Sequence, residues 1–266
     1  MMIYKLFKKP FFARFQKPWH WPADYQHSAT WEPTEFMSKS HGDIKGLLGA
    51  ALTDKVKGNI VCAHPMGYSA RGYFLKNGIA DFLRNSGYNV LIFDFNGFGD
   101  SSDGDYNLPE DVIAAGNKLQ EWAPGHKLGI FGISFGGAMS VCALSKKENP
   151  YTSAVFESTF SSLAEFWAHF GMLGKLIKIM QILTPGVEKK MNAMHNVSKI
   201  KNTKKILWIH GDADIQTPVE MGLRLQKAAN IPSDLWVVPE GEHARCYTKN
   251  PELYNDKLVD FFGETL

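Results

Sequence analysis

Cysteine is scarce in this 266-residue chain, which contains only Cys62, Cys142 and Cys246. Their odd number and wide spacing imply neither a disulfide framework nor a metal site. Cys62 and Cys142 fall within predicted core elements, where a buried free thiol is the ordinary case. This cysteine usage favours a reducing environment, so the expected location is cytoplasmic.

The chain also lacks an excess of charge of either sign. Its 29 basic and 27 acidic residues leave a net charge of +2, which provides no extended field for nucleic acid, and no nucleic-acid partner is expected. In the N-terminal stretch no apolar run is long enough for a signal-peptide core or a membrane span, and no later segment is expected to span a membrane. No Gly-x-Gly-x-x-Gly segment follows the first core strand, so a dinucleotide cofactor is disfavoured, and no cofactor or metal is expected.

Basic and aromatic residues are concentrated in a predicted N-terminal arm of residues 1–35, which precedes a predicted domain of residues 36–266. Within residues 1–21, the basic residues Lys5, Lys8, Lys9, Arg14 and Lys17 are mixed with Phe7, Phe11, Phe12, Phe15, Trp19 and Trp21. This composition suits either an interfacial helix or an arm whose aromatic rings pack on the domain. The second interpretation is favoured, and peripheral membrane contact through residues 1–21 is the alternative.

Short apolar stretches alternate with helical patterns along most of the chain. Strands are expected at 36–40, 44–52, 59–64, 89–95, 127–133, 153–157, 205–210 and 235–238, and helices at 73–85, 109–122 and 138–144. The first two strands flank a short polar turn and are typical of an antiparallel hairpin. The later alternation is typical of parallel strands linked by crossover helices. The predicted fold class is α/β, with a mostly parallel, doubly wound sheet of about eight strands.

The interval 160–203 departs from this alternation. It is rich in apolar residues as far as Leu183 and turns polar after Pro185. Such an apolar excess suits helices that cover a pocket better than one amphipathic crossover helix. Two interpretations stay open: a small helical cap inserted at about 160–203, and an elaborated crossover connection.

One strand-to-helix junction carries a serine between glycines, in the segment Gly132-Ile-Ser134-Phe-Gly136. An apolar strand, a tight turn with a serine at its apex and a following helix form the setting of a nucleophile elbow. The glycines two residues before and after Ser134 leave room where strand and helix press against a strained turn. The alternative is an ordinary glycine-rich turn without chemistry.

A serine hydroxyl becomes a good nucleophile when a base removes its proton and an acid orients that base. Asp214 and His243 each follow a predicted strand, at the edge where open parallel sheets place their sites. The chain order serine, acid, histidine is that of elbow-type hydrolases. These residues therefore predict a Ser134–His243–Asp214 triad.

Other residues compete for the roles of acid and base. Asp212 is the rival acid, and Glu157 is a weaker alternative at the end of the strand after the elbow. His64 and His210 also end strands, but they precede the acid in the chain. They are expected to brace loops through backbone hydrogen bonds.

Together these motifs resemble those of the α/β-hydrolase superfamily, particularly its short-lidded serine esterases, depalmitoylase-like hydrolases and prolyl-peptidase catalytic domains. The resemblance covers about residues 36–262. His210-Gly-Asp-Ala-Asp-Ile-Gln-Thr-Pro218 matches the pattern H-G-x-x-D-x-x-x-P with Asp214 as the acid, and Gly241-Glu-His243 matches its G-x-H turn. The resemblance implies an α/β-hydrolase fold with a small helical cap.

The resemblance also implies an oxyanion hole made of two backbone N–H groups. One is expected on Phe135, directly after the nucleophile. The other is expected on Met66, in the loop where relatives carry His-Gly-x and this chain carries His64-Pro-Met-Gly67. Pro65 has no N–H, but the donor falls one residue later and survives the change.

The apolar residues of 163–183 predict a pocket for an apolar acyl or aryl group. The pocket residues expected are Tyr68, Phe166, Trp167 and Phe170. Tyr68 and Arg71 lie near its expected mouth, where a packing tyrosine and a solvated arginine are the favoured interpretations.

The predicted function is that of a serine hydrolase that cleaves a carboxylic ester or thioester through an acyl-enzyme. The expected partner is a small-molecule acyl ester or thioester substrate. A serine peptidase acting on short peptides is the first alternative. A non-catalytic binding protein with the same fold is the second, and it is disfavoured because all three triad residues are present.

Overall fold

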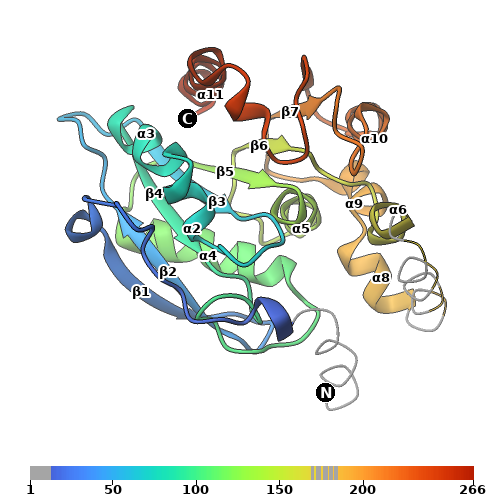
Figure 1. Cartoon of the computed structure of the whole chain (residues 1–266), viewed down its shortest axis with the longest axis horizontal. Helices are drawn as coiled ribbons and strands as arrows, with labels where there is room; N and C mark the ends of the chain where they lie inside the picture. Colours follow the sequence, from blue (N-terminus) through green and yellow to red (C-terminus); the bar gives the residue numbers. More distant parts are fainter. Residues whose placement is uncertain (1–12, 169–170, 172–174, 176–178, 180–181, 183–184) are drawn as a thin grey trace.

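The computed structural model describes residues 13–168, 171, 175, 179, 182 and 185–266. In this part of the chain an eight-stranded sheet in the order β1-β2-β4-β3-β5-β6-β7-β8 forms the centre of the molecule (Figure 1). The strands are β1 (Glu32–Met37), β2 (Asp43–Gly49), β3 (Gly58–Ala63), β4 (Tyr88–Phe93), β5 (Leu128–Ile133), β6 (Ser153–Glu157), β7 (Lys205–Gly211) and β8 (Ser233–Val238). Strand β2 is antiparallel to both of its neighbours, and β3 to β8 are parallel. The predicted α/β class and mostly parallel sheet are confirmed.

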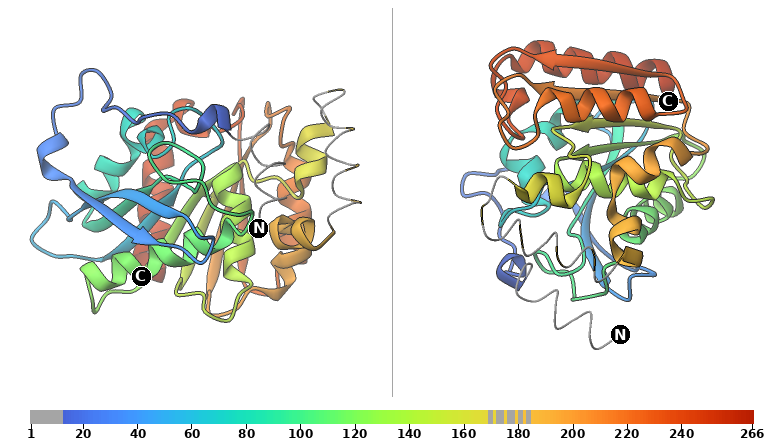
Figure 2. Two further views of the ribbon diagram at one scale, coloured as in Figure 1. Left: turned by 90° about the horizontal axis from the view of Figure 1, so that it is seen from below. Right: turned by 90° about the vertical axis from the view of Figure 1, so that its right-hand side faces the viewer.

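Helices cover both faces of the sheet (Figures 1 and 2). They are α2 (Gly72–Lys76), α3 (Ile79–Asn85), α4 (Pro109–Trp122), α5 (Phe135–Leu144), α6 (Leu163–Ala168), α8 (Pro185–Met191), α9 (Ala193–Asn196), α10 (Val219–Ala228) and α11 (Pro251–Thr265). Short 3-10 turns are η1 (Ala13–Phe15), η2 (Ser28–Thr30), η3 (Val197–Lys199) and η4 (Cys246–Thr248). One apolar cluster joins one face of the sheet to α4, α5, α9 and α10, and a second joins the other face to α2, α3 and α11.

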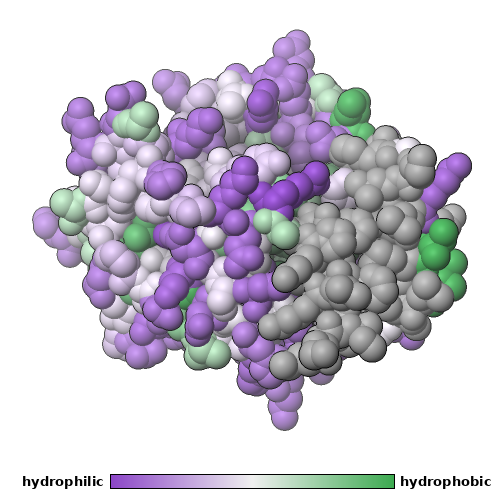
Figure 3. All heavy atoms as spheres, turned by 60° about the horizontal axis from the view of Figure 1, so that its bottom comes forward, coloured by the Kyte–Doolittle hydropathy of each residue, from purple (hydrophilic) through white to green (hydrophobic). Residues whose placement is uncertain are grey.

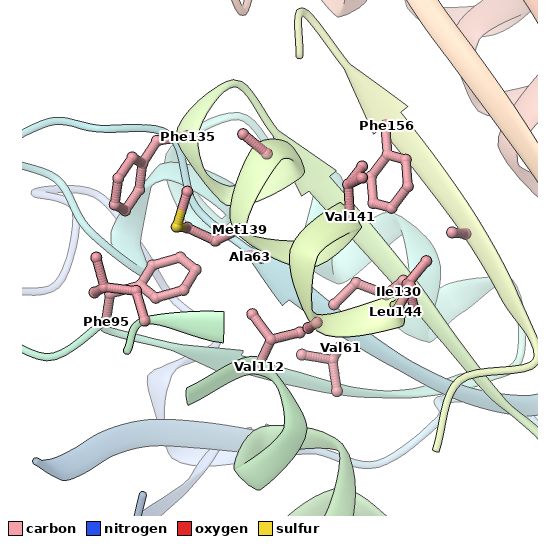
Figure 4. Packing of buried hydrophobic residues seen from close by; sticks show 14 of the residues in the cluster. Val61, Ala63, Phe95, Val112, Ile130, Phe135, Met139, Val141, Leu144 and Phe156 are labelled. Atoms are coloured by element: carbon pink, nitrogen blue, oxygen red, sulfur yellow. The ribbon is translucent and has the colours of Figure 1, made fainter. Parts of the chain in front are cut away.

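Helix α5 lies at the centre of the first cluster (Figure 4). All of its residues are buried, which explains why its sequence is apolar on every side. In that view Val141 of α5 lies beside Phe156 of β6, and Met139 of α5 lies near Phe135 and Phe95. Strands β3 to β6 are buried along their whole length, as expected of parallel strands covered on both faces.

The hairpin is confirmed, but its first strand lies earlier than expected. Strand β1 spans Glu32–Met37 rather than 36–40, because residues 38–42 form a turn in which the Ser38 N–H donates to the Gly42 carbonyl at 3.0 Å. Pro33 is tolerated within β1 because this strand lies at the edge of the sheet.

The single helix expected at 73–85 is wrong, because α2 and α3 are separate helices. Gly78 lies between them with a φ of 69°, in the left-handed region that glycine adopts at little cost. The break at Gly78 limits α2 to five residues.

The interval 160–203 contains α6, α8, α9 and η3, which gather beside α5 and α10 at one end of the sheet (Figure 1). The Met194 N–H donates to the Ser161 carbonyl at 2.9 Å and so ties α9 to the segment before α6. The assignment of this interval as a cap, like the division of the chain at residue 36, stays a prediction.

The face shown in Figure 3 is mostly hydrophilic over the described residues, with scattered hydrophobic side chains. None of the helices in the described ranges is long and apolar enough to cross a membrane.

Candidate active site

The turn between β5 and α5 holds Ser134 in a strained backbone conformation. Its φ of 51° and ψ of −110° lie outside the regions that ordinary residues occupy. Strain of this kind costs roughly 1–3 kcal/mol and persists only where the surroundings enforce it. A Cβ on Gly136 would lie 2.0 Å from the Ala63 carbonyl oxygen, and one on Gly132 would lie 2.8 Å from Gly137 Cα. Glycine is therefore required on both sides of the serine, as the elbow pattern predicts.

Ser134, His243 and Asp214 come together beyond the carboxyl ends of β5, β7 and β8. Ser134 Oγ lies 2.9 Å from His243 Nε2, and His243 Nδ1 lies 2.9 Å from Asp214 Oδ2. The side chain of His243 is 16% exposed, whereas Ser134 and Asp214 are almost fully buried. This arrangement can pass a proton from the serine hydroxyl to the imidazole while the carboxylate orients the ring.

The Asp214 carboxylate is held by its own loop. Its Oδ1 accepts the N–H groups of Gln216 at 2.9 Å and Thr217 at 2.8 Å, and the Thr217 hydroxyl donates to Oδ2 at 2.6 Å. Burial acts to raise the pKa of Asp214, but hydrogen bonds with His243 and Thr217 outweigh it and leave the pKa below its ordinary 3.8. Asp214 is therefore an ionised acceptor at neutral pH, and it favours the histidine tautomer with the proton on Nδ1.

Thr217 is a site residue that the sequence reasoning missed. Its hydroxyl lies 3.2 Å from His243 Nδ1 in addition to its hydrogen bond with Asp214. The signal available in the sequence is its place directly before Pro218, at the end of the acid motif.

Replacing Thr217 by valine is expected to lower kcat/KM for a short ester about tenfold. Valine keeps the shape but removes a hydrogen bond to a charged group, and such bonds contribute roughly 1.5–3 kcal/mol. Thr203→Val is the matched control, because Thr203 is also buried and donates to the Tyr151 carbonyl at 3.0 Å, with no contact to the triad. Equal losses in the two variants, measured by initial rates, would contradict a role of Thr217 in the site.

The carboxylates of the two rival acids accept hydrogen bonds from groups outside the triad. Asp212 Oδ1 accepts the Glu240 N–H at 2.6 Å in the neighbouring turn. Glu157 is 1% exposed; its Oε1 accepts the Cys246 N–H at 3.0 Å and its Oε2 accepts the Tyr254 hydroxyl. Burial raises the pKa of Glu157, and the hydrogen bonds with Tyr254 and Cys246 act in the opposite direction.

His64 and His210 brace loops, as expected. His64 Nδ1 donates to the Pro65 carbonyl at 2.8 Å while its Nε2 accepts the Phe95 N–H at 3.2 Å. His210 Nδ1 donates to the Thr217 carbonyl at 3.3 Å. Burial lowers the pKa of each of these histidines from 6.5 to about 4, so both are neutral in the folded protein near pH 7.

Replacing His210 by asparagine is expected to flatten the pH dependence of stability between about pH 6.5 and pH 4. In that window the unfolded wild type binds a proton on His210 that the folded protein does not bind, so stability falls as the pH falls. Across that window this histidine is expected to lower the free energy of unfolding by roughly 3 kcal/mol. The asparagine amide keeps a donor for the Thr217 carbonyl but does not titrate. Urea unfolding of both proteins at several pH values measures the effect, and parallel curves would contradict it.

Met66 and Phe135 lie on two segments that press against each other beside Ser134. A Cβ on Gly136 would lie 2.7 Å from the His64 carbonyl oxygen, so the elbow packs directly on the loop that carries Met66. Phe135 is the first residue of α5, where the helix dipole favours negative charge. Both peptide groups thus belong to the edge of the sheet that holds the triad.

One of the four expected pocket residues lies beside His243, and a second packs against the first. The ring of Phe166 on α6 lies 5.9 Å from the ring of His243, and Trp167 packs edge-on against Phe166 at 5.3 Å. Tyr68, on the loop after β3, is 59% exposed. Phe170 lies outside the described residues.

Of the predicted arm, residues 13–31 pack on the domain and residues 32–35 belong to β1. The ring of Phe15 stacks on that of Phe98 with their centres 5.3 Å apart, and the backbone N–H of Trp19 donates to Asp100 Oδ1 at 2.9 Å. Figure 1 shows η1 beside the loop that follows β4. The first twelve residues lie outside the described ranges, and membrane contact through residues 1–21 stays a prediction.

The expectation of a solvated Arg71 is wrong. Arg71 is 6% exposed, and its guanidinium contacts Asp94 and, at 2.7 Å, Asp100. It also stacks on the Trp19 ring, with its Cζ 4.4 Å from the ring centre. The network joins the loops after β3 and β4 to the arm, because Arg71 follows β3, both carboxylates follow β4 and the ring belongs to the arm.

No group of three or more histidine, cysteine, aspartate or glutamate side chains among the described residues could hold a metal ion.

Residues 77–266, well over half of the chain, match the model of the prolyl oligopeptidase family. The chain belongs to the prolyl oligopeptidase family. It is also 26% identical over 244 residues to the uncharacterised protein YfhR of Escherichia coli, a match that covers 88% of this chain and 81% of that one.

Solved structures show the same fold as this prolyl oligopeptidase-family chain. The esterase Pf2001 of Pyrococcus furiosus aligns with a TM-score of 0.72 at 19% identity, over 94% of this chain and 98% of that chain. A puromycin-hydrolysing peptidase of Mycobacterium tuberculosis aligns with a TM-score of 0.66 at 16% identity, over 89% of this chain and 39% of that chain. The expected resemblance to the α/β-hydrolase superfamily is confirmed.

Family membership places the chain among the serine hydrolases of that superfamily. An esterase and a peptidase both occur among its structural neighbours, so the fold is compatible with either substrate class.

Proposed function

We propose that this prolyl oligopeptidase-family chain hydrolyses a small-molecule carboxylic ester or thioester through an acyl-enzyme on Ser134. The observation that carries the proposal is the continuous chain of contacts from Ser134 Oγ to His243 Nε2, and from His243 Nδ1 to Asp214 Oδ2, each of 2.9 Å. A nucleophile, a base and an orienting acid at hydrogen-bond distance are what acyl transfer by a serine requires.

The chemistry follows from this geometry. Ser134 Oγ attacks the carbonyl carbon while His243 Nε2 takes the hydroxyl proton, and the N–H groups of Met66 and Phe135 stabilise the oxyanion that forms. His243 then donates that proton to the leaving alcohol or thiol, and the acyl group remains on Ser134. A water molecule, activated by the same imidazole, attacks the acyl-enzyme, and the carboxylic acid leaves as Ser134 regains its proton.

The surroundings of the base favour an ester over a short peptide. A peptidase for short peptides often needs a carboxylate that anchors the peptide amine, and the two glutamates that directly precede Phe166 and His243 in the chain are paired with arginines. Glu165 on α6 lies 2.5 Å from Arg224, and Glu242 lies 3.5 Å from Arg245. Phe166 adds an apolar wall beside His243, which suits an apolar acyl or aryl group.

The experiment that tests the substrate class compares kcat/KM for p-nitrophenyl esters of increasing acyl length, an acyl-thioester and aminoacyl p-nitroanilides. Higher values for an ester or thioester than for every aminoacyl anilide are expected, with Ser134→Ala as the background. A Glu165→Gln variant is the matched control, because it should leave ester hydrolysis unchanged. Preferential cleavage of an aminoacyl anilide, lost in Glu165→Gln, would identify a peptidase instead.

A further inference from the structure

The residue after the candidate base is held in an unusual conformation. Ala244 has a φ of 53°, in the left-handed region that residues other than glycine rarely adopt. Two side chains hold its backbone: its N–H donates to Ser158 Oγ at 3.1 Å, and its carbonyl accepts the Tyr73 hydroxyl at 2.6 Å. A strained peptide fixed at both of its polar groups is a sign of a position that the surroundings enforce.

A third side chain holds the same loop two residues later. Glu157 Oε1 accepts the Cys246 N–H at 3.0 Å, and Glu157 is itself fixed by the Tyr254 hydroxyl. The loop around His243 is therefore held by one hydrogen bond that Tyr73 donates and by two that Ser158 and Glu157 accept.

The same residues are joined to the other parts of the site. The Glu157 carbonyl accepts the Ser134 N–H at 2.8 Å, so one residue contacts both the nucleophile and the histidine loop. The Ser158 N–H donates to the Ile209 carbonyl at 2.9 Å, on the strand that leads to Asp214. Tyr73 is the second residue of α2, which directly follows the loop that carries Met66.

We propose that Tyr73, Ser158 and Glu157 are positioning residues that hold the histidine loop in register with Ser134 and Asp214. The inference rests on the proposed function, because it concerns the reaction of Ser134. A displacement of about 1 Å between reacting groups can cost roughly a hundredfold in rate, so the hydrogen bonds that fix Ala244 control catalysis without contacting the substrate. Burial raises the pKa of Tyr73 above its ordinary value, which keeps its hydroxyl a neutral donor.

The test removes one hydroxyl at a time. Tyr73→Phe and Ser158→Ala are each expected to lower kcat for a p-nitrophenyl ester about tenfold with KM nearly unchanged, because the acyl group still binds but the base is displaced. The double variant is expected to lose less than the product of the two single losses, since both side chains hold the same residue, Ala244.

Two control variants separate positioning from general loss of stability. Tyr151→Phe also removes a buried hydroxyl that donates to a backbone carbonyl, that of Val112 on α4. Ser102→Ala also removes a hydroxyl that accepts a backbone N–H, that of Asp43, at 2.8 Å. Both controls are expected to keep the wild-type kcat at temperatures well below their unfolding midpoints.

Wild-type kcat in both Tyr73→Phe and Ser158→Ala, or an equal loss of kcat in the controls, would overturn the inference. A parallel rise in KM would do the same, because it would indicate a role in substrate binding. If Tyr73→Phe does not fold, the kcat and KM of Ser158→Ala alone test the inference. Failure of the wild-type protein to hydrolyse any ester or to react with a fluorophosphonate would instead contradict the proposed function.

Discussion

Replacing Ser134 by alanine is expected to reduce kcat for a short p-nitrophenyl ester by roughly 10⁵- to 10⁶-fold, the loss found when a catalytic serine is removed. The reason is that the variant lacks the oxygen that lies 2.9 Å from His243 Nε2 and that carries the acyl group in the proposed reaction. Residual hydrolysis would come from the oxyanion donors and from substrate binding alone. Steady-state rates, with the purified variant checked for wild-type unfolding behaviour, measure the effect.

Ser145→Ala is the matched control for this variant. Ser145 closes α5, the helix that Ser134 precedes, and its hydroxyl donates to the Cys142 carbonyl at 2.7 Å. Its loss should leave kcat near the wild-type value. Hydrolysis by Ser134→Ala at an undiminished rate would remove the proposed mechanism.

Replacing Asp214 by asparagine is expected to reduce kcat about 10⁴-fold, because the asparagine amide can turn a donor toward His243 Nδ1 and so favour the wrong tautomer. The ring would then carry its proton on Nε2 and could not accept one from Ser134. Asp214 Oδ2 lies 2.9 Å from Nδ1 in the wild-type protein, which makes the tautomer sensitive to this change.

Asp212→Asn is the control for Asp214→Asn, and the pair also decides between the two rival acids. Asp212 lies two residues earlier and accepts the Glu240 N–H, a contact that the asparagine oxygen can keep. Its replacement should change kcat little. A larger loss in Asp212→Asn than in Asp214→Asn, in the same rate assay, would assign the role of the acid to Asp212.

Much of the fold could be predicted because its signals are local. Strands buried on both faces appear as continuous apolar runs, and β3 to β6 lie within a residue or two of their predicted ranges. Ser134 could be singled out because its elbow needs glycines at fixed offsets, and Asp214 because it lies at a fixed place within a recognisable motif. Two of the errors, at β1 and at Gly78, fall where a turn rather than a change in hydrophobicity ends the element.

The contacts that support the site could not be predicted, because they join residues far apart in the chain. Tyr73 and Ala244 are 171 positions apart, and Ser158 and Ala244 are 86 positions apart. The burial of Arg71 has the same origin, since its partners Asp94 and Asp100 both come from the loop that follows β4. A single sequence shows which residue types are present but not which of them meet across the sheet.

The measurement that tests the central claim most directly is the site of covalent reaction with a fluorophosphonate probe, located by intact-mass and peptide mass spectrometry. One adduct per chain, on Ser134, is expected in the wild-type protein, and no adduct is expected in Ser134→Ala. The reaction should also be strongly slowed in Asp214→Asn and little changed in Asp212→Asn. The absence of an adduct, an adduct on another residue, or labelling that persists in Ser134→Ala would contradict Ser134 as the activated nucleophile.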